Sequence, residues 1–223
     1  MKLQAVNLTK VYFKKSDHEV VALKDASVQI NEKDFCLITG ASGSGKTTFL
    51  SLMGLLTRPT HGKVFYNNEE VSAYSDAWQT KVRKRKVGFI FQQYNLLPQF
   101  SAWQNVALPN LCRSTTEAER KAQAVKVMTQ LGLKNRVDFK VAHLSGGEQQ
   151  RVAIARALVT NPEIIFADEP TAAVDDETAA AIIDVFKTLK TEGKTIIIST
   201  HDKSLIKEGT MHLTTQNGVL TQN

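Results

Sequence analysis

The chain has 223 residues, of which 42% are hydrophobic and 22% are charged, and its formal net charge is +6. These values lie near the averages of globular proteins and predict one large domain with a well-packed core. No stretch approaches the roughly 18 consecutive apolar residues of a membrane-spanning helix. The opening MKLQAVNLTK alternates like a strand and lacks the apolar core of a signal peptide. If this protein works at a membrane, we therefore expect another chain to provide the passage.

The excess of basic residues bears on possible partners. A net charge of +6 suits a surface that meets nucleic acid or anionic lipid, but nucleotide phosphates need only one or two cations, so the excess alone selects no function. The most basic run, Lys81 to Lys86, is interpreted as a solvated helix face, with a specific binding patch as the alternative. We expect no nucleic-acid partner.

The two cysteines, Cys36 and Cys112, lie far apart and outside any spacing typical of a metal site. Cys36 lies in the apolar run DFCLITG, which favours a buried free thiol. This cysteine usage indicates a reducing, cytoplasmic setting.

The hydrophobic pattern predicts strands and helices along the whole chain. Strand-like runs cover 3–8, 20–23, 26–30, 35–39, 63–67, 87–91, 163–168 and 194–200. Helical patterns cover 47–56, 75–86 and 176–193, and most of 93–160. Within that last region, a helix over 115–133 is expected to begin with a Thr115-x-x-Ala118 cap and to end at Gly132. The order of these elements predicts an α/β fold with a parallel core and a helical insertion.

The segment GASGSGKT matches the pattern G-x-x-x-x-G-K-[ST] of a phosphate-binding loop. Its glycines allow backbone dihedrals that point N–H groups toward a phosphate. Lys46 supplies a charge for the β- and γ-phosphates, and Thr47 a hydroxyl for Mg²⁺. The expected nucleotide-binding residues are Gly40, Ala41, Ser42, Gly43, Ser44, Gly45, Lys46, Thr47 and Thr48. This loop does not choose among kinases, GTPases and ATPases.

Two adjacent carboxylates, Asp168 and Glu169, end the buried run EIIFAD. In enzymes with a phosphate loop, an aspartate at this place holds Mg²⁺, and a neighbouring glutamate can accept a proton from the attacking water. The alternative is a strand-end acid pair that forms surface ion pairs.

The segment HLSGGEQQR precedes an alanine-rich apolar run. Ser145 could cap a helix there, and Glu148 would complete a capping box. Backbone N–H groups at such a helix start attract anions, but the segment offers no lysine at the phosphate position. It is therefore suited to complete a phosphate site and poorly suited to make one alone.

The run LSGGEQQR resembles the signature motif of ABC ATPases, and the other landmarks of that family follow in order. Tyr12 resembles the aromatic residue that stacks on adenine. Gln92 resembles the glutamine that touches Mg²⁺ and the attacking water, with Gln93 as the competing assignment. Asp175 resembles the D-loop aspartate, although Ala172, Ala173 and Val174 depart from the usual residues before it. His201 resembles the switch histidine that contacts the γ-phosphate.

The resemblance implies a P-loop NTPase core with a parallel sheet, an N-terminal antiparallel β portion and an inserted α-helical subdomain. It implies a single domain over 1–223, with the core in 1–92 and 161–223 and the helical subdomain in 93–160. It also implies catalytic roles for Glu169, His201 and Gln92, and metal contacts from Thr47, Gln92 and Asp168. The signature residues Ser145, Gly146, Gly147 and Glu148 would meet ATP held by a second protomer.

An ABC ATPase of this kind binds ATP and Mg²⁺, forms a homodimer or a pair of ATPase subunits, and drives a separate transmembrane permease. The motifs look most like ATP-binding subunits of macrolide-export, lipoprotein-releasing and cell-division systems, which favours export or extraction and a peripheral place on the cytoplasmic membrane face. Some of Leu96, Leu97, Pro98 and Phe100 would line a groove for the permease, or else pack within the helical lobe. The alternatives are a soluble ABC ATPase of translation or DNA repair, and a small-molecule kinase.

Overall fold

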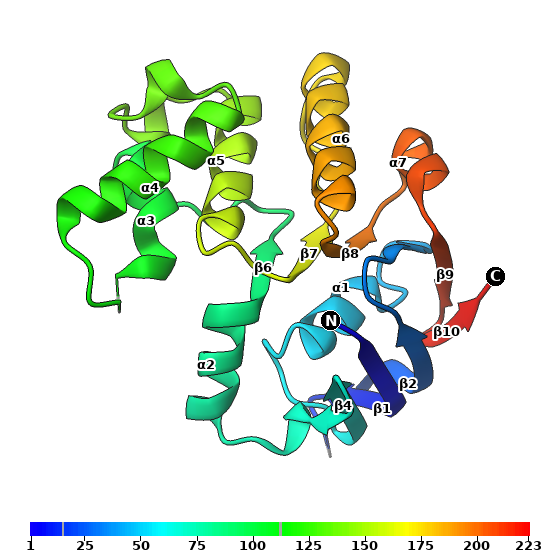
Figure 1. Ribbon diagram of the computed structural model, residues 1–223. Helices are drawn as coiled ribbons and strands as arrows, with labels where there is room; N and C mark the ends of the chain where they lie inside the picture. The colour runs from blue at the N-terminus through cyan, green and yellow to red at the C-terminus, as the bar shows by residue number, and fades with distance from the viewer. Residues whose placement is uncertain (15, 112) are drawn as a thin grey trace.

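The computed structural model describes residues 1–14, 16–111 and 113–223, so Cys112 lies outside the described residues. Two sheets organise the chain (Figure 1). A six-stranded sheet has the order β10-β9-β3-β8-β7-β6, and a four-stranded sheet has the order β2-β1-β4-β5. This arrangement confirms the predicted α/β class.

The six-stranded sheet forms the centre of the molecule. Its strands β3 (Phe35–Thr39), β6 (Val87–Ile90), β7 (Ile164–Asp168), β8 (Thr195–Ser199) and β9 (Met211–Gln216) run parallel, and β10 (Val219–Gln222) pairs antiparallel with β9. Side chains alternate between its faces, since Phe35 and Leu37 belong to one hydrophobic core and Cys36 and Ile38 to another. Both faces are therefore covered, as a parallel sheet requires.

The antiparallel sheet covers one face together with helix α1 (Lys46–Met53). It consists of β1 (Leu3–Tyr12), β2 (Val20–Ile30), β4 (His61–Tyr66) and β5 (Glu69–Glu70). The two runs predicted over 20–30 form the single strand β2. Its pairing with β1 shifts register at several points, with positive φ angles at Asn7 (49°) and Asp25 (46°). Such irregularities bend a strand without ending it.

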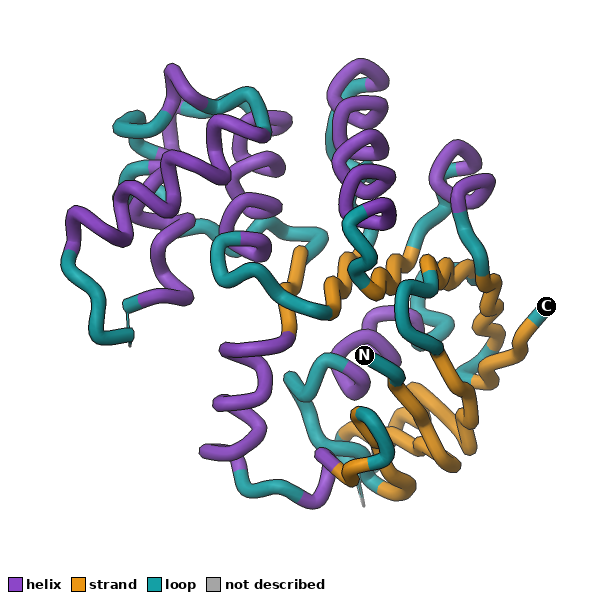
Figure 2. Tube along the Cα trace, in the orientation of Figure 1, coloured by secondary structure: helices purple, strands orange, loops and turns teal. Residues whose placement is uncertain are grey.

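Helices cover the other face of the parallel sheet. Helix α6 (Asp176–Thr191) and the short α7 (Lys203–Glu208) share a hydrophobic core with α3 (Ala102–Ala107), α4 (Glu117–Gln130) and α5 (Gly146–Leu158). Helices α3 to α5 gather beside the sheets, with short 3₁₀ turns at 108–110, 134–136 and 141–143 (Figure 2). Helix α2 (Asp76–Lys86) follows a 3₁₀ turn at 71–73 and leads into β6.

Capping residues set where these helices begin. Ser145 and Glu148 form the predicted capping box at the start of α5. At α4 the cap is Thr116 with Glu119, one residue later than the predicted Thr115-x-x-Ala118. The reason is that Glu119 can return a hydrogen bond to the backbone N–H of Thr116, which an alanine cannot.

The C-terminal elements α7, β9 and β10 have no counterpart in the predicted pattern. Strand β9 nevertheless lies inside the sheet, between β10 and β3. Its residues alternate strictly, with Met211, Leu213 and Thr215 buried, and a threonine at a core position weakens the apolar signal. Among the residues that the structure describes, no helix is long and apolar enough to cross a bilayer.

Cys36 is buried with no exposed surface, as predicted. Burial, with a smaller contribution from Asp34, raises the pKa of its thiol. Since the thiolate is the reactive form, we expect Cys36 to be inert in the folded protein. In a Cys112→Ser variant, a thiol-specific chromogenic reagent should label Cys36 only after unfolding in denaturant. Rapid labelling in native buffer would contradict this burial.

Candidate nucleotide-binding site

The phosphate loop connects β3 to α1 through glycines that adopt positive φ angles. These angles are 145° at Gly40, 75° at Gly43 and 110° at Gly45. Gly45 is the residue before the first turn of α1, and no side chain caps that turn. Backbone N–H groups at the start of α1 are thus left for an anion.

Two other segments, β2 and the C-terminal hairpin of β9 and β10, hold the loop in place. A Cβ atom at Gly40 would lie 2.2 Å from the carbonyl oxygen of Thr215, and one at Gly45 would lie 2.4 Å from that of Ala22. The hydroxyls of Ser44 and Thr215 lie 2.6 Å apart, and the N–H of Gly218 donates to the carbonyl of Ser44 at 3.0 Å. The C-terminal hairpin and β2 therefore set the shape of the loop.

Lys46 is only 7% exposed, and its ammonium group points back over the loop. It donates to the carbonyl oxygens of Gly40 (2.6 Å) and Ala41 (3.3 Å). Its Nζ also lies 3.2 Å from Nε2 of His201 and 3.8 Å from Oε1 of Glu169. The loop lysine thus meets residues that follow two other strands.

Asp168 is the buried acid at the end of β7. Its Oδ2 accepts from the Thr47 hydroxyl at 2.7 Å, and its Oδ1 accepts from the Ser199 hydroxyl. A buried carboxylate is stable when its lone pairs are hydrogen-bonded. These contacts bring the first turn of α1 and the ends of β7 and β8 to one point.

Glu169 has a positive φ of 47°, which is uncommon for a residue with a side chain. Its N–H donates to the carbonyl oxygen of Ser199 at 3.0 Å, which ties this turn to β8. The turn aims its carboxylate toward His201, with 3.4 Å between Oε1 and Nε2. The His201 side chain is 59% exposed and lies at the mouth of the site.

These residues border a cavity of about 530 Å³, a volume within the range of small-ligand pockets. Gln92 lines it and Gln93 does not, which favours the predicted assignment. The other lining residues are Ala22, Ser42, Gly43, Ser44, Gly45, Lys46, Thr47, Thr48, Asp168, Glu169, Thr171, Ala172, His201 and Asp202. Tyr12 lies at the end of β1, outside this lining, with Lys10 Nζ 5.1 Å from its ring centroid, and its role stays a prediction.

The residues Ser145, Gly146, Gly147 and Glu148 start helix α5 and do not line this cavity. Burial raises the pKa of Glu148, but hydrogen bonds from Arg136 and from the backbone N–H of Ser145 outweigh it and hold that pKa below its usual value. The start of α5 is therefore well ordered by its own contacts and lies apart from the phosphate loop of its own chain.

Asp175 caps α6 by accepting from the N–H and the hydroxyl of Thr178, both at 2.9 Å. These hydrogen bonds hold the pKa of Asp175 below its usual range. A Cβ atom at Gly147 would lie 2.8 Å from the Thr178 hydroxyl oxygen, so the starts of α5 and α6 approach closely. The Asp175 segment and the Ser145 segment thus form neighbouring surfaces.

Arg156 connects α5 to the chain that follows Gln92, a link that the sequence analysis missed. It donates to the carbonyl oxygens of Tyr94 and Asn95, and burial lowers its pKa. The Tyr94 hydroxyl in turn donates to the carbonyl oxygen of Ala173 at 3.4 Å. The contacts run through backbone carbonyls, which no residue pattern reveals.

Comparison with known proteins agrees with this geometry. The family profile described as "ABC transporter" matches residues 23–172, more than half of the chain. The chain belongs to the ABC transporter family. It is an ATPase of that family, which works with ATP and Mg²⁺.

Two curated relatives of this ABC ATPase support the predicted branch. The chain is 39% identical to the lipoprotein-releasing system ATP-binding protein LolD 1 of Caulobacter vibrioides, over 99% of this chain and 95% of that protein. It is 41% identical to the macrolide export ATP-binding/permease protein MacB of Bdellovibrio bacteriovorus, over 93% of this chain but 32% of that longer protein.

A solved structure has the same fold. The dimeric post-hydrolysis state of the ATP-binding cassette MJ0796, from Methanocaldococcus jannaschii and bound to ADP and phosphate, superposes with a TM-score of 0.92. The two chains are 38% identical, and the match covers 99% of this chain and 97% of that one.

The residues at the cavity fit Mg²⁺ bound together with a nucleotide. In the ranges 1–14, 16–111 and 113–223, no group of three or more His, Cys, Asp or Glu forms a metal site of its own. Thr47 and Asp168 instead offer hard oxygen ligands 2.7 Å apart, and Gln92 lines the same cavity. Mg²⁺ takes few protein ligands and keeps its remaining positions for water and phosphate oxygens.

Several cavity residues have no counterpart in the sequence analysis, namely Ala22, Thr171 and Asp202. Thr171 donates to Asp202 at 3.1 Å, and Asp202 caps α7. Asp202 directly follows His201, and this adjacency to a predicted site residue is the one sequence feature that could have predicted its place at the cavity. Ala22 contributes its backbone to the wall of the loop, and a backbone contact leaves no signal in the sequence.

The loop glycines offer a matched test. Gly43 and Gly45 both have positive φ, but a Cβ atom meets nothing within 4 Å at Gly43 and the Ala22 carbonyl at 2.4 Å at Gly45. Gly43→Ala should therefore cost about 1–2 kcal/mol of backbone strain. Gly45→Ala should lower the melting temperature further, at roughly 2–4 °C per kcal/mol, and weaken binding of a fluorescent ATP analogue more. Equal effects of the two variants would show that the Ala22 contact does not constrain the loop.

Proposed function

We propose that this chain hydrolyses ATP at the cavity between β3, β7 and β8 and drives a separate transmembrane permease. One observation carries the proposal. Four charged or titratable residues that follow or end three separate strands line one cavity and contact other residues of that lining. They are Lys46, Asp168, Glu169 and His201. The domain organisation that we propose is a nucleotide-binding core of residues 1–92 and 161–223 with a helical subdomain of 93–160.

Each predicted site residue that lines the cavity has a role that its position supports. The loop N–H groups and Lys46 bind the β- and γ-phosphates. Glu169 accepts a proton from the attacking water, and His201 contacts the γ-phosphate at the cavity mouth. Thr47, Asp168 and Gln92 would hold Mg²⁺, which supplies charge neutralisation at the phosphates. Tyr12 lies outside the lining, and its proposed stacking on the adenine ring rests on the family resemblance.

The second half of each site comes from a second copy. Ser145 and the glycines that follow it start α5 outside the lining of their own chain's cavity, and their N–H groups and helix dipole suit a phosphate held elsewhere. A head-to-tail pair with two-fold symmetry places each signature over the other protomer's ATP. The dimeric form of the related cassette supports this arrangement.

The partner is a permease in the membrane, and the substrate is exported or extracted. The named functions of the two curated relatives, macrolide export and lipoprotein release, support this direction. The chain then works on the cytoplasmic membrane face. Leu97 and Phe100 are partly exposed and suit a groove for the permease, whereas Leu96 packs against the core of the helical subdomain.

We expect Glu169→Gln to keep ATP binding, to lower turnover roughly 10²- to 10⁴-fold and to trap an ATP-bound dimer. The amide cannot accept the proton of water, but it keeps the size of the side chain. Phosphate release and light scattering measure the two effects. Glu163→Gln, the same change at the exposed opposite end of β7, should leave both unchanged. Turnover close to wild type in Glu169→Gln would remove this residue from the role of base.

We expect Ser145→Arg to bind ATP as a monomer but to fail in ATP-driven dimerisation, because the bulky cation lies where a partner's phosphate must approach. Thr116→Arg is the matched control, since Thr116 forms the same kind of capping box at an exposed helix start outside the signature. Mass by light scattering, in the Glu169→Gln background with ATP, should show dimer for the control alone. A dimer in both variants would contradict the proposal that the signature residues contact the ATP of the other protomer.

A further inference from the structure

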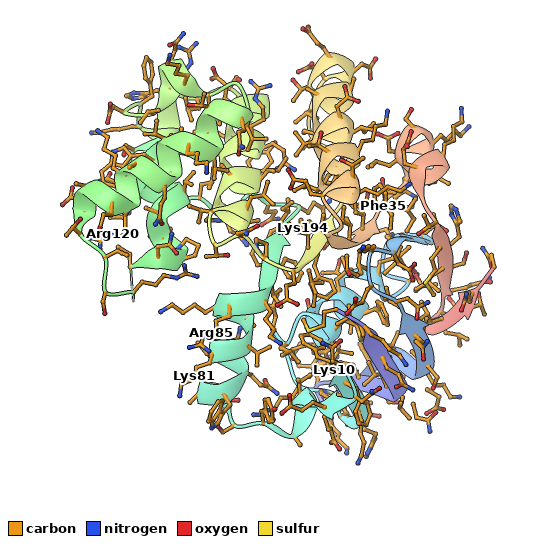
Figure 3. The ribbon with its side chains drawn as sticks, in the orientation of Figure 1. Lys10, Phe35, Lys81, Arg85, Arg120 and Lys194 are labelled. Atoms are coloured by element: carbon orange, nitrogen blue, oxygen red, sulfur yellow. The ribbon has the colours of Figure 1, made fainter. Side chains whose placement is uncertain are left out.

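Helix α2 carries an exposed stripe that the ATPase site does not use. Trp78, Lys81 and Arg85 follow the spacing i, i+3, i+7 and therefore lie along one side of the helix. All three are exposed, and the Trp78 side chain is 57% exposed. Figure 3 places Lys81 and Arg85 along α2 at the edge of the molecule. We call these three residues the α2 stripe.

The opposite side of α2 is fixed to the protein by polar contacts. Gln79 is buried and donates to the carbonyl oxygens of Val71 (3.2 Å) and Ser72 (3.3 Å). Arg83 donates to the carbonyl oxygen of Leu55 at 2.6 Å. The helix therefore keeps one orientation, and the stripe faces outward in that orientation.

The stripe combines an aromatic ring with cations. The Lys81 ammonium lies 4.4 Å from the centroid of the Trp78 ring, within the range of a cation–π interaction. The Tyr74 ring lies 6.3 Å from the same ring and supports it from the start of the helix. The ring and its cation are thus held together before any partner binds.

The charges around the stripe leave it positive. Helix α2 has five cationic side chains and one acid, Asp76. Arg58 pairs with Asp76 at 2.7 Å, and Lys63 pairs with Glu70 at 2.8 Å. The Tyr74 hydroxyl donates a hydrogen bond to the carboxylate of Glu69. The acids nearest in the chain are therefore engaged with other residues and do not neutralise Lys81 or Arg85.

We propose that the α2 stripe binds the anionic headgroups of the lipid bilayer beside the permease. Tryptophan favours the headgroup level of a membrane, and nearby lysine and arginine side chains are attracted to anionic lipids. A single-stranded nucleic acid instead requires a basic groove with successive aromatic platforms, and the stripe has one exposed ring on one side of one helix. This inference rests on the proposed function, which brings the chain to the membrane surface.

The place of α2 in the chain gives this contact a consequence. Its last residue, Lys86, leads directly into β6, and Gln92 lies two residues beyond the end of that strand. A lipid contact at α2 would fix the edge of the core that carries Gln92 relative to the bilayer. The cassette would then be oriented by two attachments, the permease and the lipid surface.

Vesicle co-sedimentation tests the proposal. Wild-type protein should bind vesicles of phosphatidylglycerol and phosphatidylcholine better than vesicles of phosphatidylcholine alone, and salt should weaken the binding. Lys81→Gln with Arg85→Gln should lower the partition coefficient by roughly tenfold or more. The control pair is Lys203→Gln with Lys207→Gln, which removes the same charge from exposed positions on α7, away from α2 in Figure 1. An equal loss in both pairs, or no preference for anionic vesicles, would overturn the proposal.

Tryptophan emission reports the contact directly. The sequence has two tryptophans, so Trp103→Phe leaves Trp78 as the reporter. Its emission should shift to shorter wavelength with anionic vesicles, and an unshifted emission would count against the stripe. Binding to duplex or single-stranded DNA without binding to vesicles would also overturn it.

Vesicle binding is also measured with the Glu169→Gln protein, and the ATP-driven dimerisation of the same preparation is measured beside it. Dimerisation without vesicle binding overturns only this inference. Vesicle binding through the stripe without ATP-driven dimerisation supports this inference and overturns the proposed dimeric ATPase.

Discussion

The parallel register of β3, β8 and β7 is the constraint on which the site depends. Phe35 and Ile165 both lie opposite Ile196, so the three strands end at the same edge of the sheet. The residues that follow them, including Lys46, Glu169 and His201, therefore meet without long loops. A slip of one residue would exchange the side chains of a strand between the two cores and would shift the residues that follow the strand away from the cavity. The register therefore serves both the core and the chemistry.

Asp168 shows how closely the core and the site are joined. It ends a strand whose residues are all buried, and its carboxylate receives hydroxyls from α1 and from β8. The next residue, Glu169, turns away from the sheet through a left-handed backbone. Both residues line the cavity, but the Asp168 carboxylate is buried against the core, whereas that of Glu169 points toward His201. The adjacency of the two acids is useful because the chain bends sharply between their side chains.

The sequence predicts the parts of the fold that come from strong, local patterns. The strand 35–39 and the Ser145–Glu148 cap agree with the structure because an apolar run and a side-chain cap are both visible in the residues themselves. Strand β9 was missed because Thr215 occupies a buried core position, where it holds Ser44 of the loop. The Arg156 and Ala22 contacts were missed because they involve backbone oxygens. Local side-chain patterns could therefore be predicted from the sequence, whereas backbone contacts between distant segments could not.

The Arg156 contact has a mechanical meaning. Helix α5 is held near its start by the pairing of Glu148 with Arg136 at 2.6 Å, and near its end by the grip of Arg156 on the carbonyls behind Gln92. Because α5 is fastened near both ends, a displacement of the chain behind Gln92 would move the helix and Ser145 together. In the dimer that we propose, α5 would therefore connect the Gln92 side of one ATP site to the signature residues that face the other.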